Sequence, residues 1–222
     1  MTSIIVEVFS FQYKNIEKGF WRQKRNMTFK KVVLKSCNPS EYRDLEITCR
    51  VLENHEIGEY LSRIPESKKM IGTKVAPVSA RKGIVGEEIN TVLKTVVEGR
   101  EYILGEESGT VKERDGNVDI VVTNESSNSH ESYIVKAAKF ASTYEPSEGG
   151  LYVPARDPRV LTEVSENVII VTAWGSEAIC LQGSYIVTYN AEENDYNTLE
   201  RGAKESTYET TPMNNSNKKL VK

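Results

Sequence analysis

The tetrapeptide STYE occurs twice in this chain, at residues 142–145 and 206–209. An internal repeat restricts the possible architectures more than local propensity does, because equivalent residues must occupy equivalent places. The residues before each STYE align in the same order. The matched pairs are Gly99 with Gly175, Glu101 with Glu177, Ile103 with Ile179, Val122 with Val187, Thr123 with Thr188, Tyr133 with Tyr196, and Tyr144 with Tyr208. We therefore predict two tandem copies of one small domain, at residues 74–146 and 151–210.

The two predicted copies have similar beginnings and differ by one insertion. KVAPVSAR, from residue 74, aligns with YVPARDPR, from residue 152. The first copy carries extra sequence at residues 105–117, whose glycines and charges favour a surface insertion. PSEGG, residues 146–150, is rich in turn-forming residues and predicts the joint. The alternative is a chance likeness between β-rich segments of similar composition.

Each copy has the pattern of a β-meander. In the second, residues 168–174, 177–181 and 184–189 are strand-like and are separated by turn residues. In the first, residues 87–99 have apolar residues at helical spacing, but their β-branched side chains favour a strand from about Thr91. The tyrosine of each STYE is expected to pack its ring on the sheet from a closing strand. A small barrel or half-barrel is typical of this spacing.

Residues 1–73 match neither copy. Segments 4–11 and 28–36 alternate like strands, and residues 40–64 carry an apolar stripe that predicts one or two amphipathic helices. The expected fold class is therefore β-rich α+β. An N-terminal α/β segment (1–73) precedes the two half-barrel domains, and a polar, disordered tail (211–222) follows them.

The first 50 residues hold ten Lys/Arg and five Asp/Glu, although the whole chain has a formal net charge of −3. Within this basic part, Trp21, Arg22, Lys24 and Arg25 place cations beside an aromatic ring. Such a mixture binds nucleic acid by neutralising phosphates and stacking on bases. Docking onto an acidic protein or onto the chain's own acidic part is an alternative, and so is a solvated basic hairpin without any ligand.

A second candidate site lies where the second copy begins. Arg156, Asp157 and Arg159 occupy a loop that prolines stiffen, and arginine presents a planar fork of donors to carboxylate or phosphate. Trp174, at a turn of the same copy, offers a stacking face. These residues predict a site for a small anionic or nucleotide ligand. The alternative is an Arg–Asp pair that only orders the loop.

The sequence offers little for catalysis. It contains neither a phosphate-binding glycine loop nor a serine nucleophile elbow. Cys37, Cys49 and Cys180 suit free thiols in a reducing compartment, and the first two with His55 are too widely spaced for zinc. We expect no catalytic residue, metal or cofactor. Because no stretch approaches the roughly 20 apolar residues of a membrane span, we expect no membrane association and a cytoplasmic location.

Short motifs link both copies to a known family. The second copy contains Gly183-Ser184-Tyr185-Ile186-Val187, then Tyr196, then the run 206–209; the first contains Asp119-Ile120-Val121-Val122, Tyr133 and the run 140–145. This pattern resembles the PGDYG-type domain of small bacterial and prophage proteins, although Ser184 replaces the family's Asp and Lys204 its Phe. The resemblance implies a compact β-rich domain of phage or bacterial origin. It supplies no catalytic residue.

The function that these observations predict is non-enzymatic binding. Duplicated modules suit binding, because a second copy adds a surface or a cleft. We expect a phage or mobile-element factor that engages a host protein or sequesters a small anionic or nucleotide ligand, with nucleic acid as a weaker alternative. An enzyme acting on a phosphate-bearing substrate and a structural subunit of a virion or multimer are the other hypotheses. The sequence is compatible with an oligomer.

Overall fold

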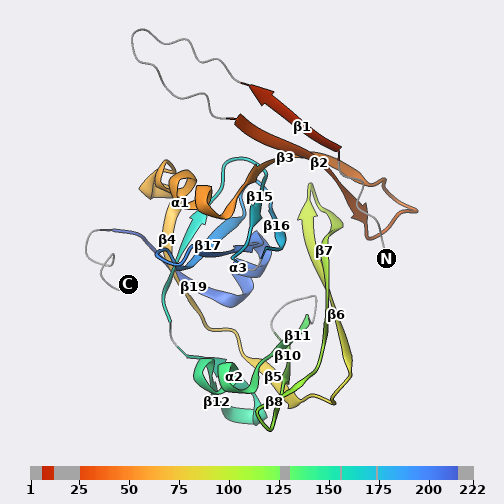
Figure 1. The fold of residues 1–222 in the computed structure, drawn as a ribbon, viewed down its shortest axis with the longest axis vertical. Coiled ribbons are helices and arrows are strands. Elements are labelled where there is room, and N and C mark those ends of the chain that lie inside the picture. The colour runs from red at the N-terminus through yellow and green to blue at the C-terminus, as the bar shows by residue number, and fades with distance from the viewer. Residues whose placement is uncertain (1–6, 13–25, 126–130, 156, 174, 215–222) are drawn as a thin grey trace.

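The computed structural model describes residues 7–12, 26–125, 131–155, 157–173 and 175–214 (Figure 1). The β-rich fold class is confirmed, because a curled, half-barrel-like sheet and three smaller sheets contain most of these residues. Three α-helices complete the described part of the chain: α1 (Asn54–Ser62), α2 (Ala137–Thr143) and α3 (Arg201–Thr207). None of the helices in these residues is long and apolar enough to cross a membrane.

The largest sheet joins the N-terminal third to both predicted copies. Its strand order is β16-β15-β3-β2-β7-β6, and β1 pairs with the outer part of β2. Its strands are β1 (Glu7–Gln12), β2 (Asn26–Ser36), β3 (Leu45–Leu52), β6 (Glu88–Val97), β7 (Arg100–Thr110), β15 (Val168–Val171) and β16 (Glu177–Cys180). The β1–β2 pair lies at one end of the molecule in Figure 1, whereas α2 lies at the other.

Two five-stranded sheets form the rest of the body. The β5 sheet has the order β11-β10-β5-β13-β12, and the β14 sheet has the order β18-β17-β14-β4-β19. The strands of the β5 sheet are β5 (Val78–Lys82), β10 (Ile120–Asn124), β11 (Ser132–Val135), β12 (Tyr144–Pro146) and β13 (Tyr152–Pro154). Those of the β14 sheet are β4 (Lys69–Lys74), β14 (Arg159–Glu163), β17 (Tyr185–Asn190), β18 (Asp195–Leu199) and β19 (Tyr208–Pro212). A small hairpin, β8 (Glu113–Arg114) with β9 (Asn117–Val118), completes the strands.

The two five-stranded sheets are assembled in the same chain order. In each, a central strand is followed by a hairpin that joins the large sheet, then by two more strands, a seven-residue helix and a closing strand. The matched glycines Gly99 and Gly175 both lie at the turn of that hairpin, with φ of 76° and 84°. The positive φ explains why glycine stands at both turns.

Each sheet also contains one strand from the other half of the chain. β4 precedes β5 in sequence, yet it pairs with β14 and β19. Conversely, β13 precedes β14 but pairs with β5 and β12. The chain passes from one five-stranded sheet to the other after Lys74 and again after Pro154. The expected domain boundary at residue 74 thus coincides with the end of a strand that belongs to the β14 sheet.

This reciprocal exchange accounts for the position of both STYE sequences. Tyr144 and Tyr208 each begin a closing strand directly after a helix, and their strand partners are Pro154 and Lys74. The preceding threonines also make matching hydrogen bonds. The Ala155 N–H donates to the Thr143 carbonyl at 2.6 Å, and the Val75 N–H donates to the Thr207 carbonyl at 2.9 Å.

The strand registers correct two details of the sequence alignment. Val122 pairs with Tyr133, whereas Val187 pairs with Asn197, so the counterpart of Tyr133 is Asn197 and not Tyr196. Because a shift of one residue in a strand moves a side chain to the opposite face, Tyr133 and Tyr196 have different surroundings. Tyr196 is buried in the core beside α1.

The openings of the two copies are also shifted. Lys74 and Pro154 are counterparts, because they face Tyr208 and Tyr144. Two residues earlier, Gly72 faces Arg159 and Tyr152 faces Val78, so Arg159 corresponds to Val78 and not to Arg81.

Several local predictions are confirmed and others are wrong. Strands are present at residues 28–36 and from Thr91, as expected. The prediction of helices over residues 40–64 is wrong in its first half, because residues 45–52 form β3 and only α1 is helical. The apolar residues of β3 alternate, and most of them pack into one cluster. The proposed insertion at 105–117 begins as a continuation of β7 rather than as a loop. The polar stretch before the second STYE contains α3.

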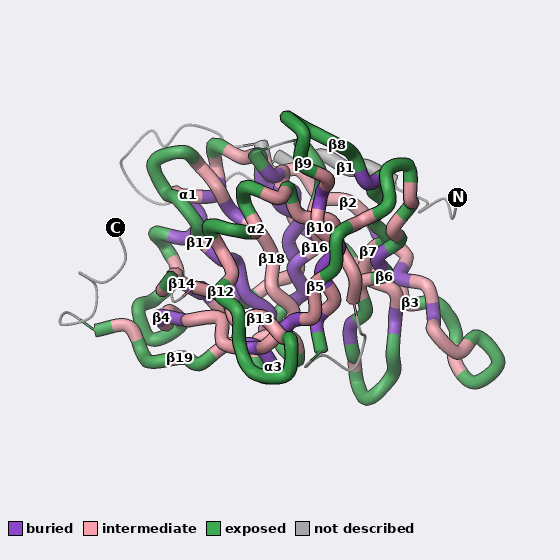
Figure 2. The backbone as a smooth tube through the Cα atoms, turned by 90° about the horizontal axis from the view of Figure 1, so that it is seen from below, coloured by how far each residue is buried: buried purple, intermediate pink, exposed green. Residues whose placement is uncertain are grey.

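The hydrophobic core runs across the expected domain boundaries. One cluster packs α1 residues Ile57, Tyr60 and Leu61 against Val168 and Ile186 of the second half. Another joins β2 and β3 to Tyr102 of β7 and Ile169 of β15. Figure 2 shows buried residues along the central strands and exposed residues in the outer turns. One core cluster therefore contains residues of the N-terminal segment and of both halves.

Candidate functional site

The structure describes only part of the predicted sites. Arg159 begins β14, and Asp157 lies two residues before it. Arg156 and Trp174 lie outside the described residues, as do Trp21, Arg22, Lys24 and Arg25 of the basic segment. The candidate site is accordingly built around Arg159.

Arg159 lies between a tyrosine ring and a carboxylate. Its guanidinium carbon is 4.1 Å from the centre of the Tyr189 ring, and its Nη2 donates to Asp157 Oδ2 at 3.2 Å. Asp157 is 68% exposed, whereas the Arg159 side chain is 19% exposed, so the carboxylate approaches from the solvent side. A stacked, partly desolvated guanidinium of this kind keeps donors available for a further acceptor.

A second group of tyrosines meets Arg159 at the junction of the two five-stranded sheets. The hydroxyls of Tyr133 and Tyr144, from the β5 sheet, are 2.9 Å apart. The Lys74 ammonium, from the β14 sheet, lies 5.9 Å from the centre of the Tyr133 ring. We call the group the tyrosine–cation cluster; it consists of Lys74, Tyr133, Tyr144, Arg159, Tyr189 and Tyr208.

Burial and like charge disfavour the positive charge of Lys74. Burial lowers the pKa of Lys74 first, the charge of Arg159 lowers it further, and Glu131 opposes the shift. Within the part of the chain that the structure describes, Lys74 forms no ion pair. Since a buried cation is normally paired, an anion between Lys74 and Arg159 would relieve an unfavourable arrangement.

Tyr133, Tyr189 and Tyr208 remain protonated at neutral pH because their pKa values are raised. Burial raises the pKa of Tyr208 to about 12, with a further rise from Tyr189 and opposition from Arg159. Burial also raises the pKa values of Tyr133 and Tyr189. Their hydroxyls are therefore neutral donors, which suits them to hydrogen-bond an oxyanion.

The corresponding positions of the β5 sheet are apolar. Arg159 corresponds to Val78, which is 0% exposed, and Lys74 corresponds to the buried Pro154. Valine and proline therefore occupy these two positions in the β5 sheet, so the architecture does not require a cation there. The positive charge is a property of the β14 sheet alone.

Sequence reasoning identified one cation of the cluster and missed the other. Lys74 is the first residue of the aligned segment KVAPVSAR, but no feature of the sequence indicated that it lies beside Arg159. Tyr189 was assigned to a strand without a role. The tyrosines of STYE were interpreted as structural residues of closing strands. The duplicated STYE motif was the one sequence feature that indicated the junction of the two five-stranded sheets.

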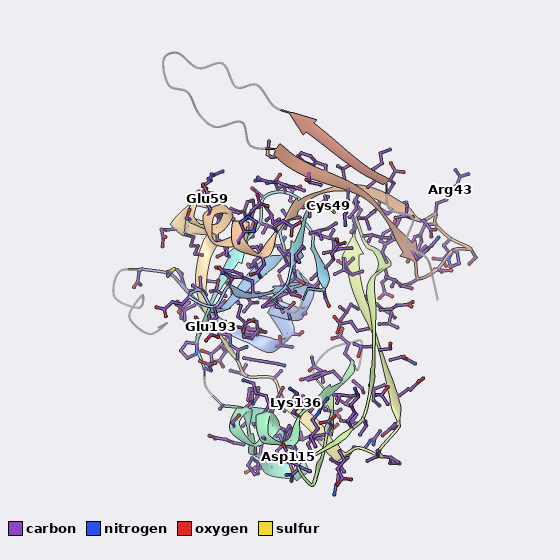
Figure 3. All side chains as sticks on the ribbon, in the orientation of Figure 1. Arg43, Cys49, Glu59, Asp115, Lys136 and Glu193 are labelled. Atoms are coloured by element: carbon purple, nitrogen blue, oxygen red, sulfur yellow. The ribbon has the colours of Figure 1, made fainter. Side chains whose placement is uncertain are left out.

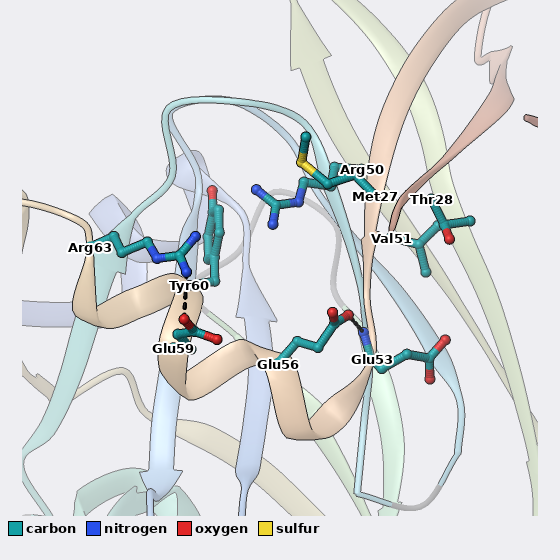
Figure 4. A pocket seen from close by; sticks show the side chains of 9 residues that line it. All are labelled: Met27, Thr28, Arg50, Val51, Glu53, Glu56, Glu59, Tyr60 and Arg63. Carbon is teal, nitrogen blue, oxygen red and sulfur yellow. Dashed lines mark hydrogen bonds and ion pairs between the residues drawn. The ribbon is translucent and has the colours of Figure 1, made fainter. Parts of the chain in front are cut away.

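A small cavity lies elsewhere, between α1 and strands β2 and β3 (Figure 4). Its volume is about 40 Å³, which is room for little more than water. The Tyr60 hydroxyl at this cavity is buried and has no hydrogen-bond partner among the described residues, while Arg50 lies 5.4 Å from the Tyr60 ring centre. The glutamates on this side are engaged, because Glu59 pairs with Arg63 and Glu56 accepts from the Glu53 N–H.

The thiols and histidine give no sign of catalysis. Burial raises the pKa of Cys49 to about 12 and raises that of Cys180 as well, so both remain protonated thiols in the interior. All three cysteines are free. His55 is exposed on α1, and the described ranges contain no group of three residues that could hold a metal ion.

No family model, no curated protein and no solved structure matches this chain.

Proposed function

We propose that this protein is a non-enzymatic binding protein that holds a small anionic ligand at the tyrosine–cation cluster. The observation that carries the proposal is the position of Lys74 and Arg159, two cations at places where the β5 sheet has Pro154 and Val78. Carboxylate and phosphate are the groups that such a pair of cations recognises. The neutral tyrosine hydroxyls supply further donors.

The ligand reaches the cluster from the side of Tyr189. This residue is 40% exposed, and Arg159 stacks on its ring. An entering oxyanion displaces or bypasses the exposed Asp157, which is the only described ion-pair partner of Arg159. We also infer that the two halves are copies of one ancestral unit. Because only the β14 sheet carries the two cations, the duplication gives one tyrosine–cation cluster per chain and not two.

The decisive experiment is calorimetric titration of pyrophosphate into the wild type and into Arg159→Val. Valine is the residue that the β5 sheet carries at the matching position, so the substitution removes the donor with little disturbance of the fold. We expect the wild type to bind pyrophosphate at the cluster and the variant to lose at least about tenfold in affinity for this site, as for a lost charge-assisted contact.

Arg43→Val is the matched control, because Arg43 is exposed at an outer edge of the molecule (Figure 3) and the substitution removes the same charge. It should bind like the wild type. Wild-type affinity in Arg159→Val, or an equal loss of affinity in both variants, would contradict a specific site at the cluster.

A further inference from the structure

A larger hollow lies on the other side of β11, formed by the β6–β7 hairpin, β8 and β11. We call it the β7–β11 groove. Its volume is about 570 Å³, which is within the range of sites for small organic ligands, about 300–1,000 Å³. Tyr133 and Ile134 are neighbours in β11, and successive strand residues face opposite sides. The groove, which Ile134 lines, is therefore separate from the tyrosine–cation cluster, which contains Tyr133.

Three cations line one part of the groove: Lys112, Arg114 and Lys136. Among the described residues, neither Lys112 nor Lys136 forms an ion pair. The chain as a whole carries a formal net charge of −3, so this concentration of cations is local. It favours an anionic ligand.

A buried carboxylate fixes the cationic part. Asp119 is 3% exposed; its Oδ2 accepts the Lys112 backbone N–H at 3.0 Å, and its Oδ1 lies 3.8 Å from Arg114 Nε. The Asp119 N–H donates in return to the Lys112 carbonyl at 3.0 Å. These contacts hold the backbone of Lys112 in one place before any ligand arrives, which reduces the entropy that binding costs.

The remaining lining is polar and lacks aromatic rings. Asn90, Ser108 and Thr110 provide amide and hydroxyl groups, Glu88 provides a carboxylate, and Ile134 is the one large apolar side chain. Without an aromatic face, the groove has no platform on which a nucleobase could stack. Hydroxyls, an amide and a carboxylate match the hydroxyl groups of a sugar, which both donate and accept hydrogen bonds.

The strands that border the groove leave no space for an added peptide strand. The Thr91 hydroxyl donates to the Ser132 carbonyl and so occupies the edge of β11. A Cβ on Gly109 would lie 3.1 Å from Ile134 Cδ1, so β7 and β11 are already in contact there. Strand addition, the usual way in which a peptide binds a sheet edge, is therefore blocked.

We propose that the β7–β11 groove binds a phosphorylated sugar. Lys112, Arg114 and Lys136 surround the phosphate, and Asn90, Ser108 and Glu88 bond the sugar hydroxyls. This is a second site, independent of the anion site at the tyrosine–cation cluster.

Calorimetric titration of glucose 6-phosphate into the full chain tests the proposal, with glucose and inorganic phosphate as the two partial ligands. We expect glucose 6-phosphate to bind at least tenfold more tightly than either partial ligand. Lys112→Met combined with Lys136→Met should weaken this binding at least tenfold. The matched control, Lys94→Met with Lys139→Met, removes two exposed lysines outside the groove and should leave binding unchanged.

The Arg159→Val variant separates this proposal from the proposed function, because it should still bind glucose 6-phosphate with wild-type affinity. Three results would overturn the groove site: no binding of glucose 6-phosphate, equal affinity for inorganic phosphate, or wild-type affinity in the groove variant. A loss of sugar phosphate binding in Arg159→Val would also overturn it and assign the ligand to the cluster.

Discussion

Arg159 occupies in the β14 sheet the place that Val78 occupies in the β5 sheet. Each of the two residues lies on the central strand of its sheet and pairs with the strand that comes from the other half of the chain. Arg159 lies opposite Gly72, and Val78 lies opposite Tyr152. Val78 is fully buried, whereas the Arg159 side chain keeps 19% of its surface exposed and is paired with Asp157. One architecture thus accepts a valine or a partly solvated cation at the same position.

Exchanging these two residues should have unequal effects on stability. Val78→Arg places an unpaired charge in a closed interior, and we expect a loss of about 3–5 kcal/mol in the free energy of unfolding. Arg159→Val removes a cation that already has solvent access, and we expect a change within about 1 kcal/mol. Urea denaturation measures both. Equal losses would show that the two positions are not counterparts.

Gly72→Ala should destabilise the β14 sheet. A Cβ at this position would lie 2.5 Å from Leu161 Cδ1 and 3.2 Å from Tyr208 Cδ1, so the core must shift. Overpacking of this kind costs about 1–3 kcal/mol. Gly105→Ala is the control, because its Cβ would meet nothing nearer than Leu93 Cδ1 at 3.8 Å. Thermal unfolding of both variants should separate them; a similar melting temperature would contradict the close packing.

The hydrogen bond between Tyr133 and Tyr144 should appear as a coupling in a double-mutant cycle. Their hydroxyls are 2.9 Å apart, and each phenylalanine variant leaves the other hydroxyl without this partner. We expect each single variant to lose about 1 kcal/mol and the coupling to be about 0.5–1.5 kcal/mol. Additive losses in urea denaturation would mean that the hydroxyls do not interact.

Tyr208 should make the protein less stable at alkaline pH. Its folded pKa is about 12, against an ordinary value of 10.0, with burial as the first cause. The folded state holds the Tyr208 proton more tightly than the unfolded state does, and this difference adds to the free energy of unfolding. The added stability is fully present below pH 10 and is lost as the pH rises through about 12. Tyr208→Phe should therefore lose less stability than the wild type between about pH 9.5 and 11.5. Parallel curves of unfolding free energy against pH would contradict the shift.

The two five-stranded sheets should unfold together. Each contains a strand from the other half of the chain, so neither can open while the other stays intact. Native-state hydrogen exchange should give the same opening free energy for amides of β10 and β17. Two well-separated unfolding transitions, one for each sheet, would show that the exchanged strands do not couple the halves.

The sequence by itself determined the strands of the two halves and the place of their closing tyrosines. β-branched runs, turn glycines and the repeated STYE are local signals, because they reflect side-chain stiffness and backbone conformation within a few residues. The helix prediction failed at residues 45–52, because Leu45, Ile47, Cys49 and Val51 alternate along the chain and pack on one face of β3, which is the period of a strand.

Only the tertiary structure decided which strands share a sheet. Nothing local distinguishes β4 from a strand of the sheet that follows it in sequence, yet its hydrogen bonds join it to residues about 90 and 140 positions later. For the same reason the sequence identified Arg159 but not Lys74 beside it. Their proximity depends on strand exchange and on registers in which a single-residue shift reverses the face of a side chain, as Tyr133 and Tyr196 show.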